Sequence, residues 1–398
     1  MARTPWTNTP SESESQLWDS IAEGVAASLA VDALTRDRAN QQADAELKLL
    51  KESGLASLLI PTEFGGPGGH WSTALRAVRI LARADSSIAQ LLAYSYITQS
   101  GIVFIGDPER WRHWFQASAS GTWLWGDSVN PIDPALSLAP CESGYVLNGR
   151  KRYSTGAATG DVTVIMGVEQ GSGRVLAAVI NHDRAGVTHV DDRDALGQRL
   201  SASGSVEFRD VFVHADDVLG EWHAEPYATL SSPASQLGFA NMYLGIAEGA
   251  LDQARRITLA RNGAWPFGAA EHYSRDPFVQ RLFGELLARV SATEALTEVW
   301  NARLDAFIAR GSDITAADRA EVEVGIARAK IMSSETALEV ASRVNEATGS
   351  SSTRSEVGLD LYWRNIRTHS LHDPVDYKKL EVGAHYLTGD VQPLTLYT

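Results

Sequence analysis

The sequence predicts an α+β protein in which a small antiparallel, barrel-like β domain separates an N-terminal helical domain from a C-terminal four-helix bundle. Two patterns support this prediction. Apolar residues recur at helical spacing towards both ends of the chain, and they alternate with polar residues in the middle. We expect the domains at residues 16–120, 121–222 and 223–398. Residues 1–15, rich in Ser, Thr, Glu and Pro, are expected to be disordered or extended.

The N-terminal domain is predicted from helical periodicity. Apolar residues recur every four positions from residue 16, at Leu17, Ile21, Val25 and Leu29. The pattern resumes over residues 47–59 until Pro61 stops it, and a further helix is expected over residues 75–92. The glycine-rich stretch 64–69 lacks the Lys-Ser/Thr of a phosphate loop, so we interpret it as a tight turn between helices.

The middle domain is predicted from short runs of β-forming residues. Residues 144–149 indicate a strand closed by an Asn-Gly turn, and residues 162–168 and 175–180 indicate two more. Residues 205–214 alternate with period two, and the β region is expected to end near Gly220.

Four helices are predicted after the β domain. The first begins near Ser235 and carries small residues that allow close packing. Asp276-Pro277 opens the second, and Thr315 with Asp318 caps the third. The fourth contains residues 362–377, and four such helices predict a bundle.

Composition excludes several functional classes. The formal net charge of −14 disfavours nucleic acid and anionic membranes as partners, because both attract clustered Lys and Arg. The single cysteine, Cys141, excludes an intramolecular disulfide and a cysteine-rich metal cage. The first residues lack the apolar core of a signal peptide, and no run approaches the ~20 apolar residues of a membrane span. We therefore expect a cytoplasmic protein.

Residues 362–377 carry the strongest signal of a functional site. His369 and His372 share a face if the segment is helical, and Pro374 predicts that such a helix stops near Asp373. Histidine exchanges protons near neutral pH, so the pair can donate to or stabilise a developing anion. Two alternatives stay open from the residues alone. One is a helix end whose imidazoles and arginines bind the last carbonyls; the other is a metal site, which lacks a further histidine at ligand spacing.

Three segments are telling in combination: Gly144-Tyr-Val-Leu-Asn-Gly-Arg-Lys151, residues 196–213 with Val218-Leu-Gly220, and Trp363-Arg-Asn-Ile-Arg367. With the order of the predicted domains, they resemble the acyl-CoA dehydrogenase fold over nearly the whole chain from about residue 16. Residues 241–252 and 362–375 are similar to the flavin-dependent monooxygenase branch of that superfamily (class D), which includes desulfurisation enzymes that oxidise a thioether sulfur to a sulfone.

The resemblance implies a two-component, FMNH2-dependent monooxygenase. A separate flavin reductase supplies FMNH2, O2 forms a flavin C4a-hydroperoxide, and one oxygen atom passes to a soft nucleophile, first of all the sulfur of an organosulfur compound. The residues agree, because a dehydrogenase commonly keeps a Glu-Gly base where this chain has His372-Asp373-Pro374. Two alternatives remain. One is an FAD-dependent acyl-CoA dehydrogenase with Asp373 or Glu248 as its base, and the other is a flavin-binding protein without turnover.

The resemblance also implies site residues. Catalytic roles go to His372, His369, Thr155 and Tyr94. The expected cofactor contacts are Tyr94, Asp127, Ser128, Asn130, Lys151, Tyr153, Ser154, Thr155, Arg261, Ser351 and His372. Gln90 and Arg193 are expected in the substrate pocket, and no metal is implied.

The chain departs from the desulfurisation enzymes at three of these positions. Gln90 stands in place of a histidine, Asp127 in place of an asparagine, and Arg193 in place of a tryptophan. The arginine makes one wall of the expected pocket polar, which favours a smaller or more polar substrate.

The expected cofactor is FMN and the expected assembly is a homotetramer. Gly263 and Ser351 stand where the resemblance places arginines near the FMN phosphate, which leaves Arg261 as the nearby cation. Residues 349–352 lack the Gly-Gly-x-Gly turn of FAD-binding dehydrogenases, so FMN is favoured over FAD.

Overall fold

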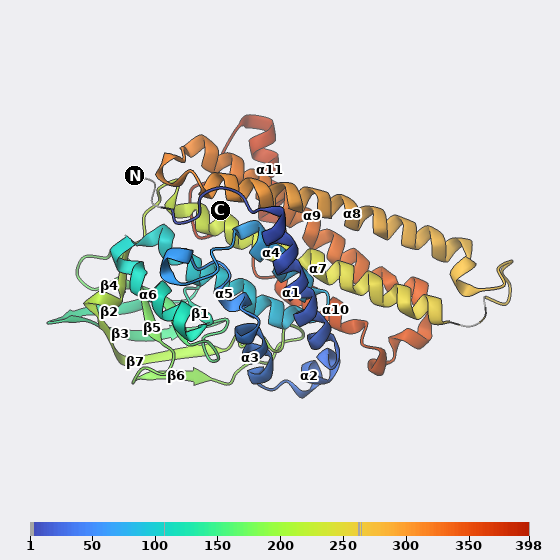
Figure 1. The fold of residues 1–398 in the computed structure, drawn as a ribbon, viewed down its shortest axis with the longest axis horizontal. Helices are drawn as coiled ribbons and strands as arrows, with labels where there is room; N and C mark the ends of the chain where they lie inside the picture. The colour runs from blue at the N-terminus through green and yellow to red at the C-terminus, as the bar shows by residue number, and fades with distance from the viewer. Residues whose placement is uncertain (1–3, 107, 262, 264, 398) are drawn as a thin grey trace.

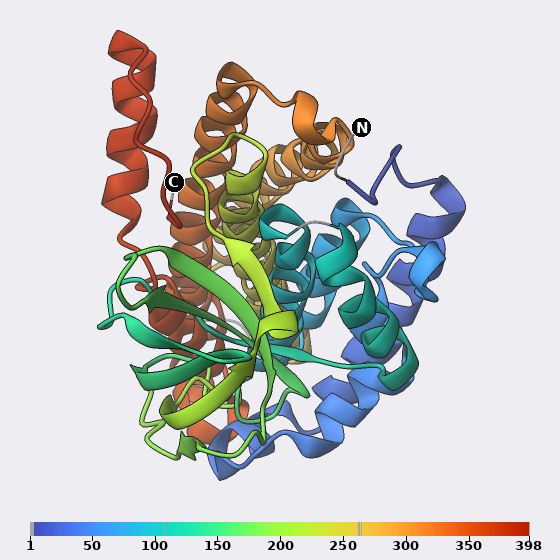
Figure 2. The same cartoon turned by 90° about the vertical axis from the view of Figure 1, so that its left-hand side faces the viewer.

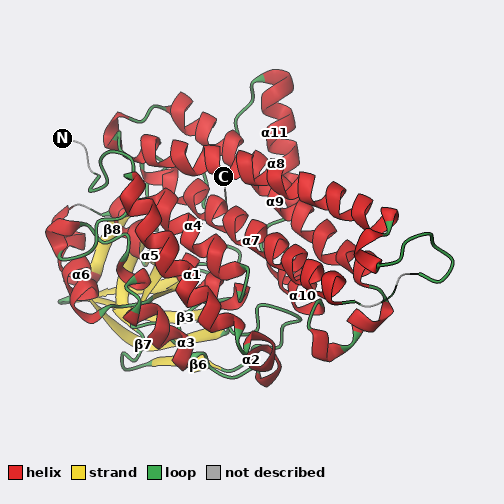
Figure 3. Cartoon of the chain, turned by 45° about the vertical axis from the view of Figure 1, so that its right-hand side comes forward, coloured by secondary structure: helices red, strands yellow, loops and turns green. Residues whose placement is uncertain are grey.

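The computed structural model describes residues 4–397 except 107, 262 and 264. A twisted β-sheet lies at one end of the molecule, and long helices of the C-terminal half extend away from it (Figure 1). Helices and sheet are segregated in the way that an acyl-CoA dehydrogenase-like α+β fold predicts (Figure 3).

The N-terminal region is helical, as expected, with the elements α1 (Glu12–Ala30), α2 (Ala33–Ala39), α3 (Asp44–Glu52), α4 (Trp71–Ala82), α5 (Ser86–Ile105) and α6 (Pro108–Gly121). The single helix expected over residues 75–92 is wrong, because Asp85 begins a new one. Its carboxylate accepts hydrogen bonds from the backbone N–H groups of Ser87 and Ile88 and so caps α5.

Two further expectations concern the N-terminal part. Residues 1–3 lie outside the described part. Within the stretch 1–15, expected to be disordered or extended, Trp6 is buried and its indole N–H donates to the Leu59 carbonyl at 3.0 Å, and α1 already begins at Glu12. By length and composition alone, α5 is also apolar enough to cross a membrane. However, 83% of its most apolar window is buried inside the protein, which makes it a core helix packed against β1 (Trp125–Ser128) and its helical neighbours.

The sheet is mixed and open, not an antiparallel barrel. The remaining strands are β2 (Leu136–Cys141), β3 (Gly144–Lys151), β4 (Val162–Glu169), β5 (Val175–Asn181), β6 (Val187–Val190), β7 (Ser205–His214) and β8 (Val218–Glu221). Their order is β6-β7-β3-β2-β4-β5-β8, so β6 and β8 end this path, and β1 pairs with β4 off it. Both β1 and β2 run parallel to β4, along consecutive stretches of one side of it. The alternation in the sequence determines which face of the sheet each residue occupies, but it does not select the neighbouring strand. An antiparallel barrel was therefore predicted where the sheet is mixed and open.

The expected Asn-Gly turn at residues 148–149 is also wrong. β3 runs straight through it, and the pairing register with β7 shifts between Leu147 and Gly149. The Asn148 side chain donates to Asp210 Oδ1 at 3.1 Å and accepts from the Asp210 N–H at 2.8 Å. The pair therefore marks a β-bulge, a bend that a turn dipeptide also favours.

The C-terminal half is the expected helical bundle, with α7 (Ser231–Ala260), α8 (Pro277–Ile308), α9 (Ala316–Thr348), α10 (Asp360–His369) and α11 (Val375–Thr388). Asp276 caps α8 with Pro277 in its first turn, and Thr315 and Asp318 form a capping box at α9, as predicted.

The fourth predicted helix is two helices. α10 ends at His369, four residues before Asp373, and α11 starts after Pro374, packs against α9 and projects beyond the bundle at its far end (Figure 2). The turn between them carries the residues of greatest chemical interest.

Close contact between α4 and α7 depends on Gly245. A Cβ at this position would lie 2.2 Å from the Arg79 carbonyl oxygen and 2.8 Å from the Ala82 Cβ. We predict that Gly245→Ala lowers the free energy of unfolding by about 1–3 kcal/mol, because the helices must separate. Gly101→Ala is the matched control: Gly101 lies in α5, and a Cβ added there would meet nothing within 4 Å, so this change should leave the stability equal or higher. Thermal denaturation of both variants checks this, and a Gly245→Ala midpoint at or above the wild-type value would contradict it.

Candidate active site

His369 and His372 meet through the turn after α10, not along a helix face. The His372 N–H donates to the His369 carbonyl at 2.9 Å. The two imidazole rings are stacked, with centroids 5.5 Å apart and planes 5° from parallel. The sequence therefore predicted the proximity of the pair correctly, but by the wrong local geometry.

His369 is buried between two phenols. Its Nδ1 is 2.8 Å from Tyr243 Oη, which is also 3.0 Å from the His369 carbonyl, and its Nε2 is 3.4 Å from Tyr94 Oη. Burial lowers the pKa of His369 well below the ordinary value, and the nearby His372 and Lys330 lower it further. His369 is thus a neutral hydrogen-bonding group at neutral pH.

An aromatic ring from α7 packs against both imidazoles. The Phe239 ring centroid is 4.8 Å from that of His369 and 5.0 Å from that of His372, and it stacks on Tyr94 at 5.5 Å. These contacts fix the imidazoles from one side and keep this part of the site apolar.

Lys330 on α9 belongs to the site although the sequence analysis missed it. Its ammonium is fully buried, 2.8 Å from Asp373 Oδ1 and 2.5 Å from Gln236 Oε1, and it lies over the rings of Phe239 and Tyr243. A signal was present, because Lys330 follows Val322 and Ile326 at four-residue spacing on the buried face of the helix.

The charges of the two acids proposed as alternative bases are already neutralised by ion pairs. Burial raises the pKa of Asp373, but the charge of Lys330 and hydrogen bonds from His372 and Lys330 outweigh it and hold the pKa well below its usual range. Glu248 Oε2 lies 2.6 Å from Arg83 Nε, on the side of α7 that faces α4. Neither carboxylate is a free base.

A second cluster, from α5 and the turn after β3, adjoins the histidines. The Thr155 hydroxyl lies 2.8 Å from Ser203 Oγ, and Gln90 Nε2 donates to the Thr155 hydroxyl at 3.4 Å. The Thr155 carbonyl accepts from the Asp127 N–H at 3.0 Å, and Ser128 Oγ bonds Ser154 Oγ at 2.9 Å.

Asp127 carries an unsatisfied carboxyl. Its Oδ1 is buried and has no hydrogen-bond partner among the described residues. Burial raises its pKa to about 7, because no cation pairs with it there. A carboxyl in this environment can be protonated, and so donate a hydrogen bond, near neutral pH.

Two other residues expected to contact the cofactor, Lys151 and Tyr153, interact with neighbouring parts of the chain. Lys151 Nζ donates to the carbonyls of Asn130 at 2.6 Å and Asp133 at 3.4 Å, so its charge orders the loop after β1. Tyr153 is 64% exposed in a left-handed conformation, beneath the Arg152 guanidinium.

Arg261 and Ser351 are not part of the histidine cluster within one chain. Arg261 follows the end of α7, 18 positions beyond Tyr243, which corresponds to about 27 Å of helix. It stacks on Tyr273 and donates to the Thr348 carbonyl, next to the exposed Ser351.

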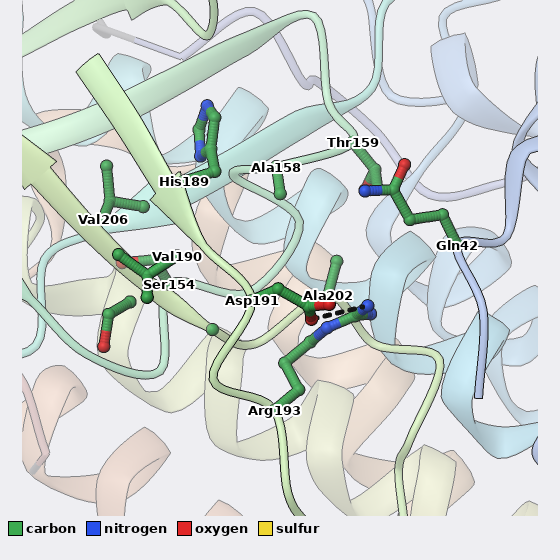
Figure 4. A pocket seen from close by; sticks show the side chains of 12 residues that line it. Gln42, Ser154, Ala158, Thr159, His189, Val190, Asp191, Arg193, Ala202 and Val206 are labelled. Carbon is green, nitrogen blue, oxygen red and sulfur yellow. Dashed lines mark hydrogen bonds and ion pairs between the residues drawn. The ribbon is translucent and has the colours of Figure 1, made fainter. Parts of the chain in front are cut away.

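Arg193 and Gln90, both expected in the substrate pocket, have different surroundings. Arg193 lies in a pocket of about 50 Å³, paired with Asp191 at 3.4 Å (Figure 4). That pocket is lined by Gln42, Ser154, Ala158, Thr159, His189, Val190, Asp191, Arg193, Ala202, Gly204, Ser205 and Val206. Gln90 instead contacts Thr155 and Ser203.

The site fits the ring half of a flavin. An isoalloxazine ring has apolar faces and a polar edge of nitrogens and carbonyls. The stacked Tyr94 and Phe239 offer aromatic surface, while Thr155 and the unpaired carboxyl of Asp127 offer polar partners. Two nearby ammonium groups are already engaged: Lys330 is paired with Asp373, and Lys151 donates to backbone carbonyls.

The fold and the site define a protein of the acyl-CoA dehydrogenase class. Residues 11–122 match the family model described as "Acyl-CoA dehydrogenase, N-terminal domain", and residues 237–377 match "Acyl-CoA dehydrogenase, C-terminal domain". The chain is 38% identical to a dibenzothiophene monooxygenase from Rhodococcus qingshengii, over 93% of each chain. It is 34% identical to a probable FMNH2-dependent monooxygenase, SfnC, from Pseudomonas putida, over 91% of this chain and 93% of that protein. The chain belongs to this family of flavin monooxygenases.

Solved structures agree. Methanesulfinate monooxygenase MsuC from Pseudomonas fluorescens superposes with a TM-score of 0.93 at 35% identity, covering 96% of this chain and 99% of that one. FMN-bound TdsC from Paenibacillus sp. A11-2 superposes with a TM-score of 0.92 at 32% identity, covering 96% and 100%.

Proposed function

We propose that this protein is the oxygenase of a two-component system, which uses FMNH2 and O2 to oxygenate the sulfur of an organosulfur compound. The observation that supports this most is the stacked pair His369 and His372 beside an ion-paired Asp373, in the loop where a dehydrogenase needs a free base. Relatives that act on dibenzothiophene or methanesulfinate support sulfur as the acceptor.

The residues that hold FMN follow from the fit of its ring. Tyr94, Thr155 and Asp127 contact the ring and its polar edge, and Ser128 and Ser154 support the strand and turn that carry them. Asn130, Lys151 and Tyr153 shape the neighbouring loop. When bound, reduced FMN supplies the electrons that activate O2.

The histidines manage protons at the reacting oxygen. His372 has its Nδ1 3.2 Å from Asp373 Oδ1, so the opposite nitrogen, Nε2, is the one that exchanges a proton in the pocket. His369 stays neutral and orients Tyr94 through its Nε2. Phe239 and Tyr397, whose rings lie 5.0 and 6.0 Å from His372, limit access of water.

The substrate is proposed to be small or polar. Gln90 places an amide beside Thr155, with its Oε1 buried and without a partner among the described residues. A hydrogen-bond donor on the substrate would satisfy that oxygen, whereas a wholly apolar substituent would not. Arg193 acts from a neighbouring pocket, not from the wall beside Gln90.

The experiment combines purified protein, FMN, NADH and a flavin reductase under ¹⁸O2 with a panel of thioethers and sulfinates. Labelled sulfoxide, sulfone or sulfonate is expected. Formation of free peroxide alone, with no sulfur compound consumed, would contradict the proposal and favour a flavin-binding protein without turnover. Tightly bound FAD that bleaches on addition of an acyl-CoA would establish the dehydrogenase alternative instead.

A separate flavin reductase, a homotetramer and a cytoplasmic location complete the proposal. Arg261 lies about 27 Å of helix beyond Tyr243, so in the proposed tetramer it would reach the FMN phosphate of a neighbouring copy, together with Ser351. We predict that Arg261→Ala weakens FMN binding about tenfold, as loss of one charge-assisted hydrogen bond implies. Arg255→Ala, on an exposed part of the same helix, is the control. Fluorescence titration measures both affinities, and equal affinities for the two variants would contradict the role of Arg261.

A further inference from the structure

A buried ammonium stands behind the histidine pair without a role in the proposed proton transfer. Lys330 is 0% exposed and comes from α9, whereas the histidines belong to α10 and the turn after it. Burying a lysine costs several kcal/mol unless it is well paired, so its two close partners, Asp373 and Gln236, need explanation.

One carboxylate oxygen joins Lys330 to His372. Asp373 Oδ1 lies 2.8 Å from Lys330 Nζ and 3.2 Å from His372 Nδ1. An ionised carboxylate only accepts hydrogen bonds, so the imidazole must present an N–H at Nδ1. A neutral imidazole with its proton on Nδ1 has a bare Nε2.

We propose that Lys330 is a positioning residue: by keeping Asp373 ionised, it holds the proton of His372 on Nδ1 and leaves Nε2 as the acceptor in the pocket. The tautomer is a property of the protein alone, and only the use made of Nε2 rests on the proposed function. Lys330 touches neither imidazole and acts through Asp373.

Asp127 shows what a carboxyl in this region does without a cation. Its pKa is raised to about 7 by burial, whereas the pKa of Asp373 lies well below the usual range beside Lys330. Burial also lowers the pKa of Lys330, and the charge of Asp373 opposes that effect, so each member keeps the other charged. Without Lys330, the Asp373–His372 pair is expected to take up one more proton at a higher pH than it does in the wild type.

That extra proton changes Nε2 in either location. If the proton resides on Asp373, the carboxyl donates to Nδ1 and the imidazole proton moves to Nε2. If it resides on His372, the imidazolium carries N–H groups at both nitrogens. Lys330→Met, which retains the length of the side chain, is therefore expected to convert a bare Nε2 into an N–H.

The test is ¹⁵N NMR of the full-length protein labelled at histidine, without FMN, recorded stepwise from about pH 8 to about pH 6, because ordinary imidazoles titrate within this range. Bare and protonated imidazole nitrogens resonate far apart, and His372→Gln identifies the His372 signals. We expect a bare Nε2 in the wild type at about pH 8, and we expect Lys330→Met to lose it at a higher pH than the wild type does. The double variant Lys330→Met/Asp373→Asn should restore it, because the Asn Oδ1 accepts from Nδ1 and has no acidic proton.

Restoration by the second substitution separates this role from a merely structural one, since a packing defect at Lys330 would persist in the double variant.

Lys51→Met is the matched control. Lys51 also pairs with an aspartate, Asp161, at 2.8 Å but far from the histidines in sequence, and its loss should leave His372 unchanged. A protonated Nε2 in the wild type at about pH 8 overturns the proposal, even if Lys330→Met fails to fold. A bare Nε2 in Lys330→Met that is lost at the same pH as in the wild type does so as well. The expected tautomers in a protein that oxygenates no sulfur compound would instead count against the proposed function alone.

Discussion

His372→Ala should reduce the rate of oxygen transfer by about 10²- to 10⁴-fold, the range that a general acid–base group contributes. The fold should survive, because the His372 side chain is 33% exposed and its removal leaves Asp373 still paired with Lys330. No buried charge is left without a partner, so the loss is one of proton exchange at the reacting oxygen. Product formation from reduced FMN, O2 and an accepted sulfur compound measures it, together with the yield of free peroxide, which should rise.

Two further variants make this result specific. His372→Phe keeps a ring against Phe239 and should be as impaired as His372→Ala, which would show that the nitrogens matter and not the stacking. His223→Ala removes an exposed histidine ahead of α7 and should change nothing. An unaltered rate in either His372 variant would sink the assignment of His372 as the proton-exchanging group.

The ion pairs also bear on the dehydrogenase alternative. A base that removes a proton from carbon must be free to accept it, yet Asp373 Oδ1 is held by Lys330 and Glu248 by Arg83. In this chain His372 therefore stands where a dehydrogenase has its free carboxylate, and Lys330 pairs with the carboxylate of the neighbouring Asp373. A residue on a different helix removes the basicity of the carboxylate that remains.

Local signals in the sequence predicted the parts of the fold that are locally determined. The caps at Asp276 and Thr315 and the alternation of β7 each involve residues within a few positions, and each was confirmed. The pairing of β1 and β2 with one strand was missed, because it depends on segments that are distant in the chain.

The candidate site shows the same division. His369 and His372 were found because they are close in sequence, and Thr155 and Tyr94 through the resemblance. Lys330 was missed because its meaning comes from Asp373, 43 positions away, and from the rings of α7. The break after His369 was missed because Pro374 restricts only the residue before it, whereas the helix ends earlier.

The second of the two largest expected effects is a dependence of protein stability on pH that comes from the buried carboxyl of Asp127. Its pKa rises from 3.8 in the unfolded chain to about 7 in the folded protein, so between these values the folded state binds more protons. Stability attributable to this carboxyl is present below about pH 4 and is lost as pH rises through 7. At about 1.4 kcal/mol per unit, the loss is at most about 4 kcal/mol.

Asp127→Asn should therefore stabilise the protein at about pH 8 by up to about 4 kcal/mol more than it does at about pH 4, because an amide does not ionise. Any cost of an unsatisfied amide is the same at both pH values, so it cancels in the difference. Thermal midpoints of variant and wild type at the two pH values measure this difference. Asp194→Asn, at an exposed aspartate, is the control and should show none. Equal shifts for Asp127→Asn at both pH values would mean that the carboxyl is already ionised in the folded state at low pH. Asp127 could not then be the neutral donor that a flavin edge would meet.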